Sequence, residues 1–421
     1  SAILPLHYFS KVVGLAPYSL EDMFQGSRTG HSKMFKYVNA IYSIVVFLLV
    51  IFLFPFLVIW KLEVIYAMTA DDGITFVIVD ILGSITQFFA NICSIFQLAF
   101  RSLEKIQKMF CEMKKIDILL NIKSKFYRRI GIYCIIQVLF CSIFSSLLYG
   151  YDFILWFDIK ENFSDVSKIL NNTIMMVMVI IFVNYIAYVK TRLKILNCEL
   201  MKCFGFNAEK EIDIYLQRLS AYRLSDSDDG HRNGEPSFPD KFHHYEFNKG
   251  FPKLILWDKI RILREVNFKL NQLIIDLNSV YSIPLLLEIL TILVKIAVKL
   301  HLVIVTIFFE NVTERPKALF AIVNTCWITL FFVKLILMTV YCQKVMNHAS
   351  HTLLLLQKLL TLTPLHKDLA KELEIFSEQL LHNNLQISPC GFFVLDHPFL
   401  SRCLEILVAY IVILLQFTQS D

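Results

Sequence analysis

Charged residues are scarce in this 421-residue sequence, and so is glycine. Only 18% of the residues are charged and 56% are hydrophobic, whereas a soluble domain has about 25% charged and about 45–50% apolar residues. With 12 glycines, the chain has no Gly-rich phosphate loop, and it also has neither a nucleophile elbow nor a His-Glu-x-x-His pair. We therefore expect neither an enzyme nor a cofactor, and the net charge of +5 gives no reason to expect a nucleic-acid partner.

The hydrophobic residues fall into seven blocks, each long enough to cross a bilayer, which takes about 20 helical residues. The blocks are residues 39–60, 74–100, 130–157, 169–188, 280–309, 318–340 and 399–417. A β-barrel would show short alternating strands instead, so spanning helices are expected. The sequence therefore predicts an all-α membrane protein with seven transmembrane helices.

Lysine and arginine are unevenly distributed between the two ends of these predicted spans. The segments 1–38, 101–129 and 341–402 hold eighteen of them, and the long connection 190–279 holds fifteen more. The three intervening loops hold only five. Because positive residues mark the cytoplasmic side, we expect the N-terminus to be cytoplasmic and the C-terminus extracellular.

Three Asn-X-Ser/Thr sequons, at Asn162, Asn171 and Asn311, lie in or beside the loops that the charge distribution places outside. These three asparagines are therefore candidate glycosylation sites, and Asn171 is the one closest to the membrane. None of the ten cysteines falls in these loops, so no disulfide framework is implied. No His/Cys cluster suggests a metal site either.

The C-terminus carries a motif that reads Ala409-Tyr410, five hydrophobic residues, and Gln416-Phe417. Two shorter elements precede the last span, Pro389-Cys390-Gly391-Phe392-Phe393 and Leu395-Asp396. Together they resemble the signature of insect gustatory receptors, which usually has Thr where Ala409 stands here. Seven spans with a cytoplasmic N-terminus are also the arrangement of the insect chemoreceptor superfamily.

The resemblance implies a tetrameric, ligand-gated, non-selective cation channel, in which the last helices of four subunits line the pore. Ala409, Ile413 and Gln416 lie on one face of that helix, which fits this role. We expect them to line the pore or its gate together with Phe417, and Ile413 to form a hydrophobic constriction that gates by dewetting. The alternative for Gln416 is an ordinary interfacial glutamine.

Apolar residues recur at helical spacing in the cytoplasmic connections, which indicates that these connections are helical too. Such helices in contact would form an anchor region between subunits. The expected organisation is a cytoplasmic segment at 1–38, a ligand-binding bundle at 39–340 with cytoplasmic helices at 101–129 and 190–279, anchor helices at 341–398, the pore-lining span at 399–417 and an extracellular tail at 418–421.

Ionisable residues inside a bilayer cost about 2.5–3.5 kcal/mol each on insertion scales, so they need partners or a wet cavity. Here they are Asp80, Glu288, Lys295, Lys299, His301 and Lys334. Two interpretations remain open for them. They form ion pairs within the bundle, for example between Asp80 and a lysine, or they form the floor of a pocket for a polar ligand.

Asn324 and Trp327 share a face of the sixth span and resemble polar and aromatic positions of gustatory receptors. They are the first choice for ligand contact, because aromatic walls with a few polar groups are usual in small-molecule sites. The full set of expected ligand contacts is Asn324, Trp327, Asp80, Asp152, Trp156 and Lys299. For Trp156, a place in the interfacial aromatic belt is the other interpretation.

The leading hypothesis is thus a gustatory receptor in the plasma membrane of gustatory neurons, with a small-molecule tastant and the lipid bilayer as partners. A bitter or plant-derived compound is the first expectation for the tastant, and a fructose-type sugar is the second. The tetramer is either homomeric or includes co-receptor subunits. The alternative is a secondary transporter of a small polar solute, although the sequence has no internal repeat. A G-protein-coupled receptor is disfavoured by the orientation.

Overall fold

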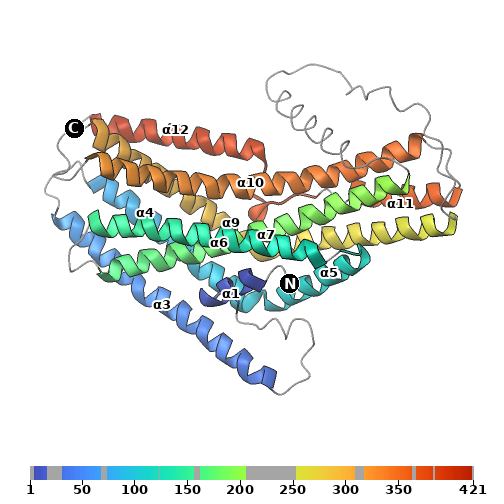
Figure 1. Cartoon of the computed structure of the whole chain (residues 1–421). Coiled ribbons are helices and arrows are strands. Elements are labelled where there is room, and N and C mark those ends of the chain that lie inside the picture. Colours follow the sequence, from blue (N-terminus) through green and yellow to red (C-terminus); the bar gives the residue numbers. More distant parts are fainter. Residues whose placement is uncertain are drawn as a thin grey trace.

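The computed structural model describes residues 4–16, 31–67, 74–122, 124–155, 162–204, 253–308, 317–362, 367–382 and 385–419. Within these ranges every regular element is a helix, so the all-α prediction is confirmed (Figure 1). The first elements are α1 (Leu4–Val12), α3 (His31–Ala67), α4 (Ile74–Ile95), the π-helix η2 (Phe96–Arg101), α5 (Leu103–Leu119) and α6 (Ser124–Leu155). The later ones are α7 (Asn162–Cys203), α9 (Lys253–Phe308), α10 (Lys317–Leu362), α11 (Lys367–His382), the 3-10 turn η4 (Pro389–Gly391) and α12 (His397–Gln419).

Three helices are much longer than a bilayer is thick. At 1.5 Å per residue, the 42, 56 and 46 residues of α7, α9 and α10 extend about 63, 84 and 69 Å, against about 30 Å of hydrocarbon. α9 continues without a break from the predicted connection 190–279 into the predicted fifth span. The spans therefore do extend into long helices, as the sequence predicts.

Four helices in the described part of the chain are long and apolar enough to cross a membrane. They contain the segments Tyr37–Ile59, Ile81–Arg101, Val166–Cys203 and Ala318–Thr361, and α6 adds a shorter apolar stretch, Ile135–Gly150. α9 differs from them because Glu288, Lys295 and Lys299 interrupt its apolar half. The number of seven spans and their orientation remain predictions.

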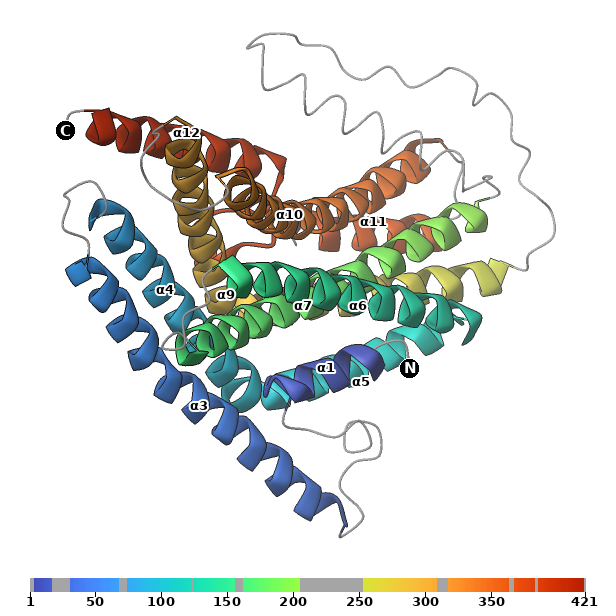
Figure 2. The same ribbon diagram turned by 60° about the vertical axis from the view of Figure 1, so that its left-hand side comes forward.

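α7 forms the centre of the bundle. Its residues from Ile174 to Val189 are buried almost all round, as expected for a helix that is surrounded by other helices. α3, α9 and α10 pack against it, and Figure 2 shows α7 inside the bundle with α3 at one edge. α3 exposes large apolar side chains such as Leu48 and Phe52, which suit a lipid-facing helix.

A buried ion pair connects α5 to the extended part of α7. Arg192 donates from Nε to Oδ1 of Asp117 at 2.9 Å and from Nη2 to Oδ2 at 3.3 Å, so the contact is bidentate. The Tyr188 hydroxyl donates to the same carboxylate at 3.0 Å, and the guanidinium carbon of Arg192 lies 3.7 Å from the Tyr188 ring centroid. The Arg192 side chain is fully buried, and this contact ties α5, which packs mainly on α9, to α7.

Candidate functional site

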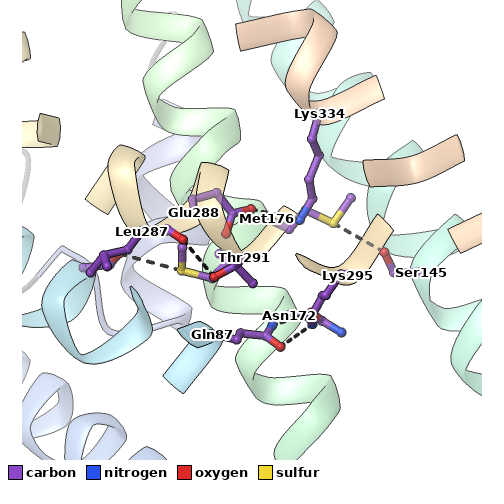
Figure 3. A network of polar contacts seen from close by, with 11 residues as sticks. Gln87, Ser145, Asn172, Met176, Leu287, Glu288, Thr291, Lys295 and Lys334 are labelled. Carbon is purple, nitrogen blue, oxygen red and sulfur yellow. Dashed lines mark hydrogen bonds and ion pairs between the residues drawn. The ribbon is translucent and has the colours of Figure 1, made fainter. Parts of the chain in front are cut away.

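Polar side chains from α4, α7 and α9 meet inside the bundle (Figure 3). The Lys295 ammonium donates to the side-chain oxygens of Asn172, at 2.9 Å, and of Gln87. The Gln87 amide in turn donates to Asn172. Gln87 is buried, and buried amides pair with one another and with cations because an unsatisfied polar group in an apolar bundle is costly. The three helices are therefore joined by one hydrogen-bonded triad.

An ion pair between α9 and α10 lies next to this triad. The Lys334 ammonium is 3.4 Å from Oε1 of Glu288, and both side chains are buried. The Phe331 ring lies near two ammonium groups, with Lys334 at 5.7 Å and Lys295 at 5.6 Å from its centroid. Cation–π attraction offsets part of the cost of burying these charges. We call Gln87, Asn172, Glu288, Lys295, Phe331 and Lys334 the polar cluster.

Aromatic side chains extend the polar cluster toward α6. Trp327 stacks on Phe331 with ring centroids 5.9 Å apart, and Tyr149 of α6 meets Trp327 edge to face at 5.0 Å. Asn324, one helical turn from Trp327, is buried and donates to the backbone carbonyl of Phe320 at 2.9 Å. The face of α10 that holds Asn324, Trp327 and Phe331 therefore lies inside the bundle.

The other expected ligand residues are Lys299, Asp80, Asp152 and Trp156. Lys299 is half-buried one turn after Lys295, and it is Lys295 that bonds Gln87 and Asn172 in the polar cluster. Asp80 belongs to α4 and Asp152 to α6, while Trp156 lies outside the described residues. None of these placements tests ligand binding, so all six residues remain predictions.

Sequence reasoning missed the amides Gln87 and Asn172. A signal was present, because amides within apolar spans hydrogen-bond across helix interfaces. A second pair behaves in the same way: Asn91 of α4 donates to the side chain of Asn171 at 2.6 Å, and Asn171 donates to Ser167 at 3.3 Å. Asn171 is only 4% exposed, so a glycan on it is incompatible with this packing. Of the other sequons, Asn162 begins α7 and Asn311 lies outside the described residues.

α12 presents two different faces. Phe399, Cys403 and Leu407 are buried against the bundle, where α12 packs on α9 and α10. Ala409, Ile413 and Gln416 lie outside that buried stripe and are exposed, and Ile413 is 50% exposed. Phe417 also belongs to α12.

Asp396 caps the start of α12. Its carboxylate accepts a hydrogen bond from the backbone N–H of Phe399 at 3.0 Å, which is the geometry of a helix N-cap. Asp396 is the last residue of the Leu-Asp element that precedes the final span, so this part of the motif has a structural role.

Comparison with known proteins agrees with these features. The model of the family described as 7tm chemosensory receptor matches residues 3–421. The chain is a member of the chemosensory receptor family. No curated protein sequence matches the receptor. Among solved structures, it is similar to the insect olfactory receptor OR5 from Machilis hrabei, with a TM-score of 0.63 and 12% identity over 99% of this chain and 97% of that one.

A second structure of OR5, in complex with eugenol, matches the receptor equally well, with a TM-score of 0.63 and 13% identity. Its coverage is again 99% of this chain and 97% of that chain. At this level of identity the likeness establishes the fold alone. The predicted membership of a chemosensory receptor family is confirmed by the family model.

Proposed function

We propose that the receptor is a gustatory, ligand-gated cation channel in which α12 of four subunits lines the pore. The observation that carries this proposal is the two-faced α12. In a single chain, the face with Ala409, Ile413 and Gln416 is exposed, although two of these three side chains are apolar. A central pore would place Ile413 as a dewetting constriction and Gln416 as a ring of amides that contacts hydrated cations. Four-fold assembly would thus occupy a face that the bundle does not cover.

The polar cluster and the aromatic side chains beside it are the proposed tastant site. Trp327, Phe331 and Tyr149 offer ring faces, while Lys295 and Gln87 offer donors and acceptors. This mixture of aromatic walls and a few polar groups is usual for a small-molecule site. A related fold, OR5 of Machilis hrabei, has been solved with the small molecule eugenol. We propose a bitter or plant-derived tastant, with a fructose-type sugar as the second class.

The remaining parts of the proposal follow from the sequence. The receptor is placed in the plasma membrane of gustatory neurons, with the N-terminus in the cytoplasm because of the lysine and arginine distribution. The extended helices form the proposed anchor between four copies, or between this chain and co-receptor subunits. Asn162 and Asn311 are the proposed glycosylation sites.

The test is patch recording from cells that express this chain, with sugars and plant alkaloids perfused. We expect single-channel steps carried by cations in response to at least one compound. Ile413→Ala should increase the current without ligand, because a smaller side chain lets water enter the constriction and ions then pass. Val408→Ala is the matched control, since Val408 is an exposed aliphatic residue on a different face of α12. Uptake of a solute without channel steps would instead identify the secondary transporter.

A further inference from the structure

The segment that leads into α12 folds back on itself. We call residues 385–396 the linker. The backbone N–H of Leu395 donates to the carbonyl of Ile387 at 3.0 Å, and both side chains are buried. The turn η4 lies inside this loop and packs on α9. The conformation of the linker therefore sets the position from which α12 starts.

The linker contains a residue in a costly conformation. Cys390 has φ 52° and Gly391 has φ 76°, so both lie in the left-handed region. For a residue with a Cβ atom this region costs about 1–2 kcal/mol, whereas glycine adopts it freely. Such a conformation persists only where the surroundings hold it. Something other than local preference must therefore stabilise Cys390.

Three side chains from the bundle hold the backbone of the linker and of His397, the first residue of α12. On α9, the side-chain oxygen of Asn278 accepts from Ser388 N–H at 3.2 Å, and the Ser282 hydroxyl oxygen accepts from Cys390 N–H at 2.5 Å. On α10, Oε1 of Gln343 accepts from His397 N–H at 3.3 Å, where α12 begins. We call Asn278, Ser282 and Gln343 the linker clamp.

The linker clamp lies on the helices that also carry the polar cluster. Ser282 precedes Glu288 by six residues and Lys295 by thirteen, which is about 9 Å and about 20 Å along α9. Pro284 stands between them inside the helix and has no N–H for the carbonyl of Val280. The hydrogen-bond ladder of α9 is thus interrupted between the proposed tastant site and the clamp, so α9 can bend there.

We propose that Asn278, Ser282 and Gln343 are positioning residues for gating, because they hold the linker in its left-handed conformation and thereby set the opening equilibrium of α12. The inference rests on the proposed pore role of α12. The two-state element is the linker, which is either clamped at Ser282 with Cys390 left-handed, or released. A change in the polar cluster that moves α9 against α10 alters the clamp and so the balance between these states.

The decisive test compares variants that weaken the clamp with one that strengthens it. Ser282→Ala and Asn278→Ala each remove an acceptor, so both should shift the open–closed equilibrium in the same direction, by about 2- to 10-fold each. Cys390→Gly removes the strain of the clamped linker, so it should shift the equilibrium in the opposite direction. The readout is single-channel open probability with the perfused alkaloid or sugar that evokes current, measured alongside the concentration for half-maximal response.

Ser279→Ala is the matched control. Ser279 lies on α9 one turn from Ser282, but its hydroxyl accepts from Lys105 of α5 instead of contacting the linker. Its open probability should equal that of the unmodified receptor. An unchanged equilibrium in both Ser282→Ala and Asn278→Ala, or a Cys390→Gly shift in their direction, overturns the proposal.

A second measurement needs no current and therefore separates this inference from the proposed function. Cys390 is exposed, so a maleimide can label its thiol in the purified receptor, with exposed Cys111 on α5 as the internal reference. Asn278 contacts the backbone of Ser388 and not the Cys390 thiol. Faster labelling of Cys390 in Asn278→Ala would therefore report a change in the conformation of the linker backbone. We expect the ratio of Cys390 to Cys111 labelling to rise several-fold. An unchanged ratio overturns the clamp even if the receptor conducts, and a raised ratio in a receptor without current refutes only the channel.

Discussion

The ion pair between Arg192 and Asp117 allows a quantitative prediction about the extended part of the bundle. Asp117→Asn keeps the shape of the side chain and its ability to accept from the Tyr188 hydroxyl, but it removes the charge that faces Arg192. The Arg192 side chain is fully buried, so water cannot replace the lost carboxylate. Removing one partner of a buried pair costs about 3–5 kcal/mol. The Tyr188 ring, 3.7 Å from the guanidinium carbon, retains part of the stabilisation, so we expect about 3 kcal/mol.

The assay is thermal unfolding of the purified receptor in detergent, followed by the loss of its monodisperse peak in size-exclusion chromatography. Asp117→Asn should lower the melting temperature strongly. The double variant Asp117→Leu/Arg192→Met should recover most of the loss, because a packed apolar pair can replace a buried ion pair at little cost. A melting temperature for Asp117→Asn equal to that of the unmodified receptor would refute this reasoning. So would a double variant as unstable as the single one.

Three further changes test other parts of the fold by the same melting assay. Glu288→Gln leaves the Lys334 ammonium without the carboxylate that it faces at 3.4 Å, so it should destabilise the receptor, whereas Glu288→Asp should do so less. Asn271→Leu should stabilise it by about 1 kcal/mol or more, because the buried Asn271 amide has no hydrogen-bond partner among the described residues, and a lower melting temperature would contradict this. Burial raises the pKa of Glu112, but hydrogen bonds and charge from neighbouring lysines, among them Lys269, outweigh it and lower the pKa overall. A carboxyl group with a lowered pKa in the folded state contributes stability that is lost as the pH falls through that pKa. Lys269→Ala removes part of this contribution, so its melting temperature should fall less than that of the unmodified receptor when the pH is lowered below about 5.

Helix content was predictable because it depends on local patterns. Long apolar blocks, few glycines and helical spacing in the connections all favour helices, and the continuous 56-residue α9 combines two of these signals. The shared face of Asn324 and Trp327 followed from their spacing alone, and both are buried in the bundle. Features that depend on a single helix could therefore be predicted from the sequence.

The partners of the polar residues could not be predicted from the sequence, because they depend on which helices become neighbours. Gln87 and Lys295 are 208 residues apart and meet only because α4 packs on α9. Lys295 and Lys299 are one turn apart with similar surroundings in the sequence, so pattern reasoning could not choose between them. Asn171 shows the same limit: its sequon reads as a surface signal, but its contact with Asn91 of α4 buries it.

On the gating proposal, α9 and α10 transmit the state of the polar cluster in different ways. α10 runs from Trp327 to Gln343 with no proline between them, so it moves as one stiff rod. α9 has Pro284 between its cluster residues and Ser282, and beyond that its Arg264 is tied to Glu372 of α11 at 2.9 Å. A displacement at the cluster therefore reaches Gln343 along an unbroken helix, whereas on α9 it meets Pro284 before it reaches Ser282. α9 holds the linker and α10 holds the first residue of α12, so their relative movement acts on the left-handed turn that leads into α12.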